Sequence, residues 1–340
     1  MSQPVKDNSA SSHYIAGFDY LRIAAAFAVV WIHGSDTNPM ALRLQDFCAF
    51  AVPSFILMSA YLSTESFMKK QDMGPGEFLS ARARRLIPAY LGWSFIYLAL
   101  RFFKHRFITS SPLDVDWISV FLFGGASYQL WFVPLLLLWS AAFGTIMRST
   151  AKTKKKNAAG ALLIFLAVLL CWKGPEIVQH VKVPVGYEMV RYLAVDTGFF
   201  FFGIGLWALF RNPGSAPLMP QAFSHKVMGL AGVGLSFAGM KLHILEHWFT
   251  PIFSLSTFWI SLRPGNPASS RIVRHLSPCA FGIYLCHGIF VEGLQTMAGR
   301  AGIDVGSLSA TFGIIIGAFV MSAVLCVSLR NSRTMRWLVV

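Results

Sequence analysis

Ten apolar segments follow one another along the chain, and they restrict the possible folds more than any other feature of the sequence. About 20 mostly apolar residues are enough for a helix to cross the hydrocarbon core of a bilayer. Because hydrocarbon offers no hydrogen-bond partners to the backbone, segments of this length cross as helices. The ten are centred on residues 18–36, 45–64, 86–103, 130–147, 158–173, 192–210, 227–245, 249–263, 279–297 and 309–329. We therefore predict an all-α fold, a polytopic transmembrane helical bundle with about ten spans.

Composition and charge exclude several other classes of protein. Of the 340 residues, 55% are apolar and 13% are charged, whereas soluble domains carry about 25% charged residues. This excludes a disordered chain, a coiled coil and a single soluble core. The net charge of +14 would suit nucleic acid, but the basic residues occupy short loops between apolar segments. We therefore expect a lipid bilayer, and no nucleic acid, as a partner.

The distribution of Lys and Arg predicts the orientation of the bundle. With the N-terminus inside and alternating spans, the inner loops hold 19 of the 29 Lys and Arg residues and the outer loops hold nine. Cytoplasmic loops are enriched in these residues, so both termini are predicted to be cytoplasmic. This gives a polar tail at 1–15, a transmembrane domain at 16–330 and a C-terminal tail at 331–340. The polar first residues do not resemble a cleavable signal peptide.

The first apolar segment carries ionisable residues, which are costly in a membrane and therefore candidates for function. Arg22 and His33 are eleven residues apart, which places them on one helical face, separated by about 16 Å along the axis. Asp19 and Asp36 lie one turn from Arg22 and His33, respectively. A neutral imidazole is a suitable general base for a hydroxyl, and Asp36 could fix its tautomer. In the alternative interpretation, Arg22 reaches the inner head groups and His33 lies at the outer interface.

Further polar residues interrupt later segments. His287 lies one turn from Tyr284, and Asp196 has Arg191 nearby as a potential partner. Just inside the third span, Arg82, Arg84 and Arg85 form a cluster that suits phosphate oxygens, although a basic inner loop needs no ligand. His287 could instead be a buried structural histidine. Trp131, at the start of the fourth apolar segment, could belong to the aromatic belt at the membrane interface.

One metal-binding pattern is treated as accidental. His243, Glu246 and His247 match the H-x-x-E-H order of some zinc peptidases. A zinc site needs a further protein ligand presented by the fold, and this segment is a short turn between two spans. We therefore expect no metal site.

Five short motifs together resemble the acyltransferase family 3 of bacterial integral-membrane proteins, which O-acylate surface carbohydrates. The first is Arg22 followed, after ten residues, by His33. The others are Ser59 to Tyr61, where Ala60 stands in place of the family's Gly, and the stretches 82–90, 128–134 and 281–287. They occur in order and cover the chain from about residue 16 to residue 330.

The resemblance implies an activity and a location. It implies an O-acetyltransferase in the bacterial cytoplasmic (inner) membrane that moves an acetyl group from cytoplasmic acetyl-CoA to a hydroxyl of a cell-surface or exported polysaccharide. The acceptor would be a glycan or a lipid-linked saccharide, and no cofactor would be bound permanently. On this hypothesis His33, Arg22 and Asp36 are catalytic, and Arg82, Arg85 and Arg22 bind the coenzyme. Four residues would line the acceptor site: Tyr284, His287, Trp131 and Ser59.

Two other functions fit the same residues. One is a proton-coupled exporter or flippase of a saccharide or lipid-linked sugar, with His33, Asp36, Asp196 and His287 as proton-relay groups. The absence of a recognisable inverted repeat counts against it. The other is a non-catalytic membrane subunit of a glycan-assembly complex. The sequence carries no signal for an oligomeric state or for acetyl over another acyl group.

Overall fold

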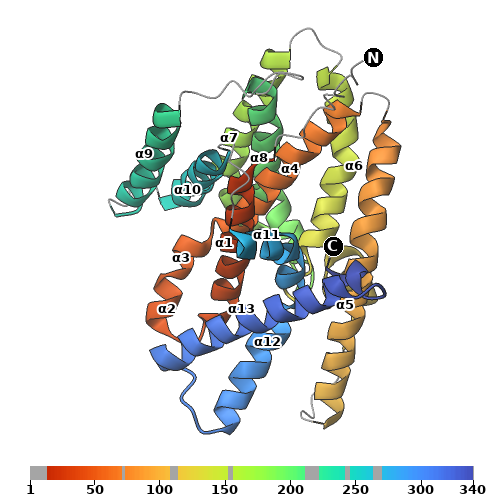
Figure 1. Ribbon diagram of the computed structural model, residues 1–340, viewed down its shortest axis with the longest axis vertical. Coiled ribbons are helices and arrows are strands. Elements are labelled where there is room, and N and C mark those ends of the chain that lie inside the picture. Colours follow the sequence, from red (N-terminus) through yellow and green to blue (C-terminus); the bar gives the residue numbers. More distant parts are fainter. Residues whose placement is uncertain are drawn as a thin grey trace, which may run out of the picture.

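The structure is a computed structural model that describes residues 14–70, 73–107, 114–151, 156–210, 222–241, 246–262 and 270–339. These residues form helices and no strands (Figure 1), as predicted. The ten long helices are α1 (Ala16–Gly34), α4 (Ala51–Lys69), α5 (Pro75–Phe107), α6 (Phe132–Ala151), α7 (Lys156–His180), α8 (Glu188–Phe210), α9 (Ala222–Lys241), α10 (Glu246–Ser261), α12 (Ala280–Arg300) and α13 (Leu308–Asn331). Six short elements connect them: α2 (Pro39–Arg43), α3 (Gln45–Cys48), η1 (Ser119–Phe123), α11 (Arg271–Leu276), η2 (Ser277–Cys279) and η3 (Arg336–Leu338).

Each predicted apolar segment coincides with one long helix. Within the described part of the chain, seven helical stretches are long and apolar enough to cross a membrane. They contain α1, α4, α5, α7, α8, α12 and α13. The all-helical, multi-pass architecture is therefore confirmed, whereas ten crossings and two cytoplasmic termini remain predictions.

Helix α5 is much longer than the apolar segment that predicted it. It has 33 residues and begins at Pro75, a residue type that suits the first turn of a helix because its missing N–H has no partner there. Arg, Ala and Leu between Pro75 and the membrane segment are strong helix formers, so the helix continues through its basic turn. Hydropathy marks only the part of a helix that faces lipid or core.

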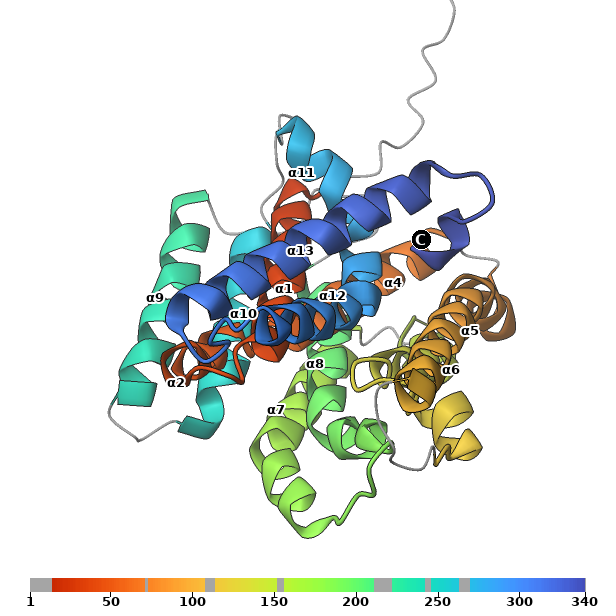
Figure 2. The ribbon, with the colours of Figure 1, turned by 90° about the horizontal axis from the view of Figure 1, so that it is seen from below.

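Helix α1 runs through the middle of the molecule and contacts α4, α10, α12 and α13 (Figure 2). Three helix pairs, α5 with α6, α7 with α8, and α9 with α10, are arranged around it. Its small residues Ala25 and Ala26 are completely buried, which allows neighbouring helices to approach closely. The middle of α1 is therefore closely packed against its neighbours.

The segment after α13 packs back against α5. Trp93 Nε1 donates a hydrogen bond to the carbonyl oxygen of Leu338 at 2.8 Å, and Leu338 and Val339 are 4% and 1% exposed. The end of the segment predicted to be a C-terminal tail, at Leu338 and Val339, is thus packed in the bundle. This contact lies between segments distant in sequence, so the few apolar residues after the last span do not indicate it.

Candidate active site

Two histidines from distant parts of the sequence lie side by side in the bundle. The rings of His33 on α1 and His287 on α12 are stacked, with centroids 5.2 Å apart. The ring of Tyr128, from the loop before α6, lies 4.4 Å from that of His33. The fold therefore brings together two of the residues that the sequence singled out, from opposite ends of the chain.

The surroundings of His287 determine which of its ring nitrogens carries the proton. His287 is fully buried, and its Nδ1 lies 2.7 Å from the carbonyl oxygen of Tyr284. Because a carbonyl oxygen only accepts hydrogen bonds, Nδ1 carries the proton and Nε2 is left with a lone pair. Nε2 has no hydrogen-bond partner among the described residues.

A polar network holds the loop before α6 against α12. Tyr284 donates its hydroxyl hydrogen to the carbonyl oxygen of Gln129 at 2.5 Å. Gln129 Nε2 and the hydroxyl of Tyr97 both donate to the carbonyl oxygen of Leu285, at 3.2 and 2.8 Å. These bonds satisfy buried polar groups and set the position of Tyr284 next to the histidines.

A cavity of about 460 Å³ opens beside His33. We call it the histidine cavity. Its polar and aromatic lining consists of His33, Trp131, Arg191, Tyr192, Asp196, Phe199, Thr250 and Tyr284, and its remaining lining is mostly apolar. A concave, largely apolar site with a few convergent polar groups is typical of small-molecule binding. The predicted residues His33, Trp131 and Tyr284 all line it.

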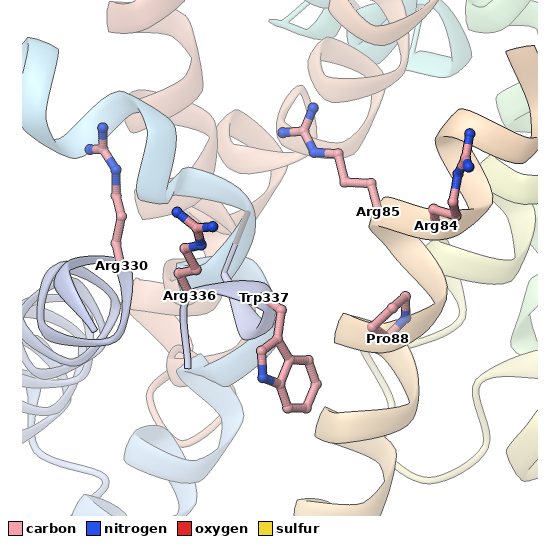
Figure 3. A pocket seen from close by; sticks show the side chains of 6 residues that line it. All are labelled: Arg84, Arg85, Pro88, Arg330, Arg336 and Trp337. Atoms are coloured by element: carbon pink, nitrogen blue, oxygen red, sulfur yellow. The ribbon is translucent and has the colours of Figure 1, made fainter. Parts of the chain in front are cut away.

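A second pocket, of about 510 Å³, is lined by four arginines and is called here the arginine pocket. Arg84 and Arg85 come from α5, whereas Arg330 and Arg336 come from the end of α13 and from η3 (Figure 3). Pro88 and Trp337 complete the lining. Guanidinium groups that converge on one pocket match the oxygens of phosphate groups.

Arg330 and Arg336 were not predicted to belong to a site. Both follow the last motif, which ends at residue 287, by more than forty residues. They join Arg84 and Arg85 because the C-terminal segment folds back on α5. Arg330 also donates to the carbonyl oxygen of His275 at 3.1 Å, which fixes part of the wall.

Arg82 and Ser59 contact each other rather than the arginine pocket. Arg82 Nη2 donates to Ser59 Oγ at 2.6 Å, and Arg82 Nε lies 3.4 Å from Ser140 Oγ. The side chain thus joins α5 to α4 and α6. Two predicted roles, coenzyme binding for Arg82 and acceptor binding for Ser59, involve residues that hold these helices together.

Arg22 lies near the start of α1, whereas Asp36 lies two residues beyond its end. Arg22 forms a 3.1 Å ion pair with Asp19, and its charge lies close enough to that of Arg85 for the two to repel each other. Asp36 is exposed and accepts a hydrogen bond from Gln295 Nε2 at 3.2 Å. Among the described residues, no hydrogen bond or ion pair joins Asp36 to His33, whose ring lies against those of His287 and Tyr128.

The described residues contain no group of three or more His, Cys, Asp or Glu side chains that could hold a metal ion. The side chains of His243, Glu246 and His247, which carry the peptidase-like pattern, lie outside the described part of the chain.

Comparison with known proteins gives one match. Residues 15–330 match the profile of acyltransferase family 3, described as an acyltransferase domain. No curated protein and no solved structure matches the chain.

Proposed function

The chain belongs to this acyltransferase family, whose profile covers nearly its whole length, and on that premise we propose an O-acetyltransferase of the bacterial inner membrane. It takes the acetyl group from cytoplasmic acetyl-CoA and transfers it to a hydroxyl of a cell-surface or exported polysaccharide. The observation that carries this proposal is the presence of two pockets of different chemistry, one with four arginines and one with a stacked histidine pair beside it.

The predicted topology places the two pockets on opposite sides of the membrane. The histidine cavity is lined by the end of α1 and the start of α8, which alternation assigns to the outer side. The arginine pocket is formed by the first part of α5 and the end of α13, which alternation assigns to the inner side. A donor from the cytoplasm and an acceptor from outside would each meet the pocket suited to it.

The arginine pocket suits the phosphate groups of the donor. Arg84, Arg85, Arg330 and Arg336 line it, and charge-assisted hydrogen bonds between arginine and phosphate are among the strongest in proteins. Trp337 offers a flat surface for the adenine ring. Arg22, whose charge lies near that of Arg85, extends the positive potential toward His33 along α1.

His33 acts as the general base in this scheme. Its imidazole removes the proton from an acceptor hydroxyl as the oxygen attacks the thioester carbonyl of acetyl-CoA. The C–S bond breaks, the coenzyme leaves as a thiolate, and the imidazolium of His33 returns the proton to that sulfur. An O-acetyl ester and free coenzyme A result, with no other reactant required. The stacked ring of His287 restricts the orientation of His33.

The proposal is tested with membranes that contain the wild type, His33→Ala or Arg22→Ala, supplied with acetyl-CoA labelled in the acetyl group. His180→Ala is the matched control, because His180 is exposed at the end of α7. We expect transfer of label to glycan by the wild type and the control. His33→Ala should reduce the rate at least about 100-fold, the contribution typical of a general base.

The alternatives give different results in the same assay. Undiminished transfer by His33→Ala, at equal protein levels, would show that His33 is not the base. If the wild type consumes no acetyl-CoA with any glycan acceptor, the exporter hypothesis replaces the enzyme hypothesis.

A further inference from the structure

One buried carboxyl group in the histidine cavity has no structural role that the fold explains. Asp196, on α8, is 4% exposed, and its Oδ2 atom has no hydrogen-bond partner among the described residues. The next residue shows the contrast, since Thr197 Oγ1 donates to the carbonyl oxygen of Leu193 and accepts from Trp139 Nε1. Thr197 thus contributes to helix packing, and Asp196 does not.

A buried carboxyl group without a partner is costly. Polar groups in protein interiors are nearly always hydrogen-bonded, and an unpaired one lowers stability. In a membrane protein the cost is higher still, and such residues face the bundle interior or a cavity where they meet ions or substrates. Asp196 lines the histidine cavity, so a molecule in that cavity can supply the missing donor.

The rest of the wall indicates which kind of molecule fits. Trp131 and Tyr192 stack on each other, with ring centroids 4.1 Å apart and planes 17° from parallel, and both line the cavity. His33 lies on the same wall as a base for one hydroxyl. Flat aromatic surface together with separate polar groups suits a ligand with apolar faces and several hydroxyls, as in a sugar ring.

We propose that Asp196 accepts a hydrogen bond from an acceptor hydroxyl other than the one that is acylated. By holding that second hydroxyl, Asp196 determines which hydroxyl of the sugar reaches His33, and it is therefore a specificity-determining residue. This inference rests on the proposed acyltransferase function. It assigns to α8 a role in acceptor recognition that none of the sequence motifs indicates.

The test measures sugar binding without any donor, so that it is independent of acyl transfer. Purified wild type, Asp196→Ala and the control Asp46→Ala, which removes an exposed carboxyl group on α3, are titrated with a panel of methyl glycosides by calorimetry. Alanine is used because asparagine would keep an oxygen that accepts hydrogen bonds. Loss of a hydrogen bond from a ligand to a buried carboxyl group costs about 5- to 100-fold in affinity. We expect this loss for Asp196→Ala and no change for Asp46→Ala.

Monodeoxy glycosides provide a second test. Its first measurement uses only the wild type and therefore does not depend on the folding of a variant. With the wild type, one deoxy position should weaken binding about as much as Asp196→Ala does, because it removes the hydroxyl that Asp196 holds. With Asp196→Ala the same deoxy position should cost little, since the accepting oxygen is already absent. Equal penalties at every position in both proteins would overturn the proposal.

The failure of the proposed function is distinguishable from the failure of this inference. Sugar binding that depends on Asp196, without any acetyl transfer by the wild type, would refute the enzyme and leave the sugar site. Acetyl transfer by the wild type, with the same sugar affinity and the same acylated hydroxyl in Asp196→Ala, would refute the role of Asp196 and leave the enzyme.

Discussion

Arginines that are close in sequence have different environments in this protein. Arg82 is directed at the hydroxyls of Ser59 and Ser140, in the interface of three helices. Arg85, less than one turn further along α5, faces the opposite wall of the arginine pocket, which Arg336 lines. Residues on one helix separated by about 100° per position meet different neighbours, so a cluster in the sequence need not be a cluster in function.

This difference predicts that substitutions of Arg336 and Arg82 change different properties, donor binding and stability, respectively. Arg336→Ala should raise the KM for acetyl-CoA about 10- to 100-fold, because a charge-assisted hydrogen bond to phosphate is lost, and should leave thermal stability unchanged. Arg82→Ala should lower stability by about 2 kcal/mol, because two serine contacts are lost in the helix interface. Donor kinetics and thermal unfolding in detergent, with the exposed Arg300→Ala as control, separate the two. An unchanged KM in Arg336→Ala would contradict the assignment of the pocket.

At the scale of helices, small residues decide how closely neighbours approach. Gly203 on α8 lies against α4, where an added Cβ atom would be 2.6 Å from Ala60 Cβ and 2.9 Å from the carbonyl oxygen of Leu57. Contacts this short force the backbones apart. The close approach of α4 and α8 positions two walls of the histidine cavity, so helix packing and site geometry are linked here.

A single methyl group at this contact should therefore be harmful. Gly203→Ala is expected to cost about 1–3 kcal/mol, the usual penalty for overpacking, and to lower the yield of folded protein and the thermal midpoint. Gly313→Ala on α13, where nothing lies within 4 Å of the added atom, is the matched control. It should be neutral or stabilising by up to about 1 kcal/mol, because alanine favours helix. Equal behaviour of the two variants would contradict the packing argument.

The helices could be predicted from the sequence because hydropathy and length are local properties, and the shared face of Arg22 and His33 because helical geometry is fixed. Contacts between distant segments are not local. The stacking of His287 on His33, the pairing of Arg82 with Ser59, and the return of Arg336 to α5 all depend on tertiary packing. Asp36 illustrates the same limit. Its position one turn from His33 suggested that it fixes the tautomer of that imidazole, whereas its hydrogen bond comes from Gln295.

For the whole molecule, the main consequence of the predicted topology is that the two pockets lie toward opposite faces of the membrane. The histidine cavity lies toward the outer face, and the arginine pocket lies toward the inner face. Acetyl-CoA carries several negative charges and does not cross a bilayer unaided. The proposed function together with the predicted topology therefore predicts that a donor from one compartment modifies an acceptor in the other.

Sealed vesicles of defined orientation test this arrangement. Acetyl-CoA added outside should support acetylation in inverted vesicles, whose exposed face is cytoplasmic, and not in right-side-out vesicles. Detergent should restore activity to the right-side-out preparation, which controls for the amount of enzyme. Equal use of external donor by both kinds of intact vesicle would contradict the predicted topology.

The return of the C-terminal segment to α5 also affects how the protein can be handled. Leu338 and Val339 are almost completely buried, and Trp337 beside them lines the arginine pocket. An affinity tag or fluorescent fusion attached directly after these residues would begin within a few residues of that pocket and compete with its contacts. Purification handles are better placed at the other end of the polypeptide or behind a long linker. If the arginine pocket binds the donor as proposed, a short C-terminal tag is expected to lower the measured donor affinity.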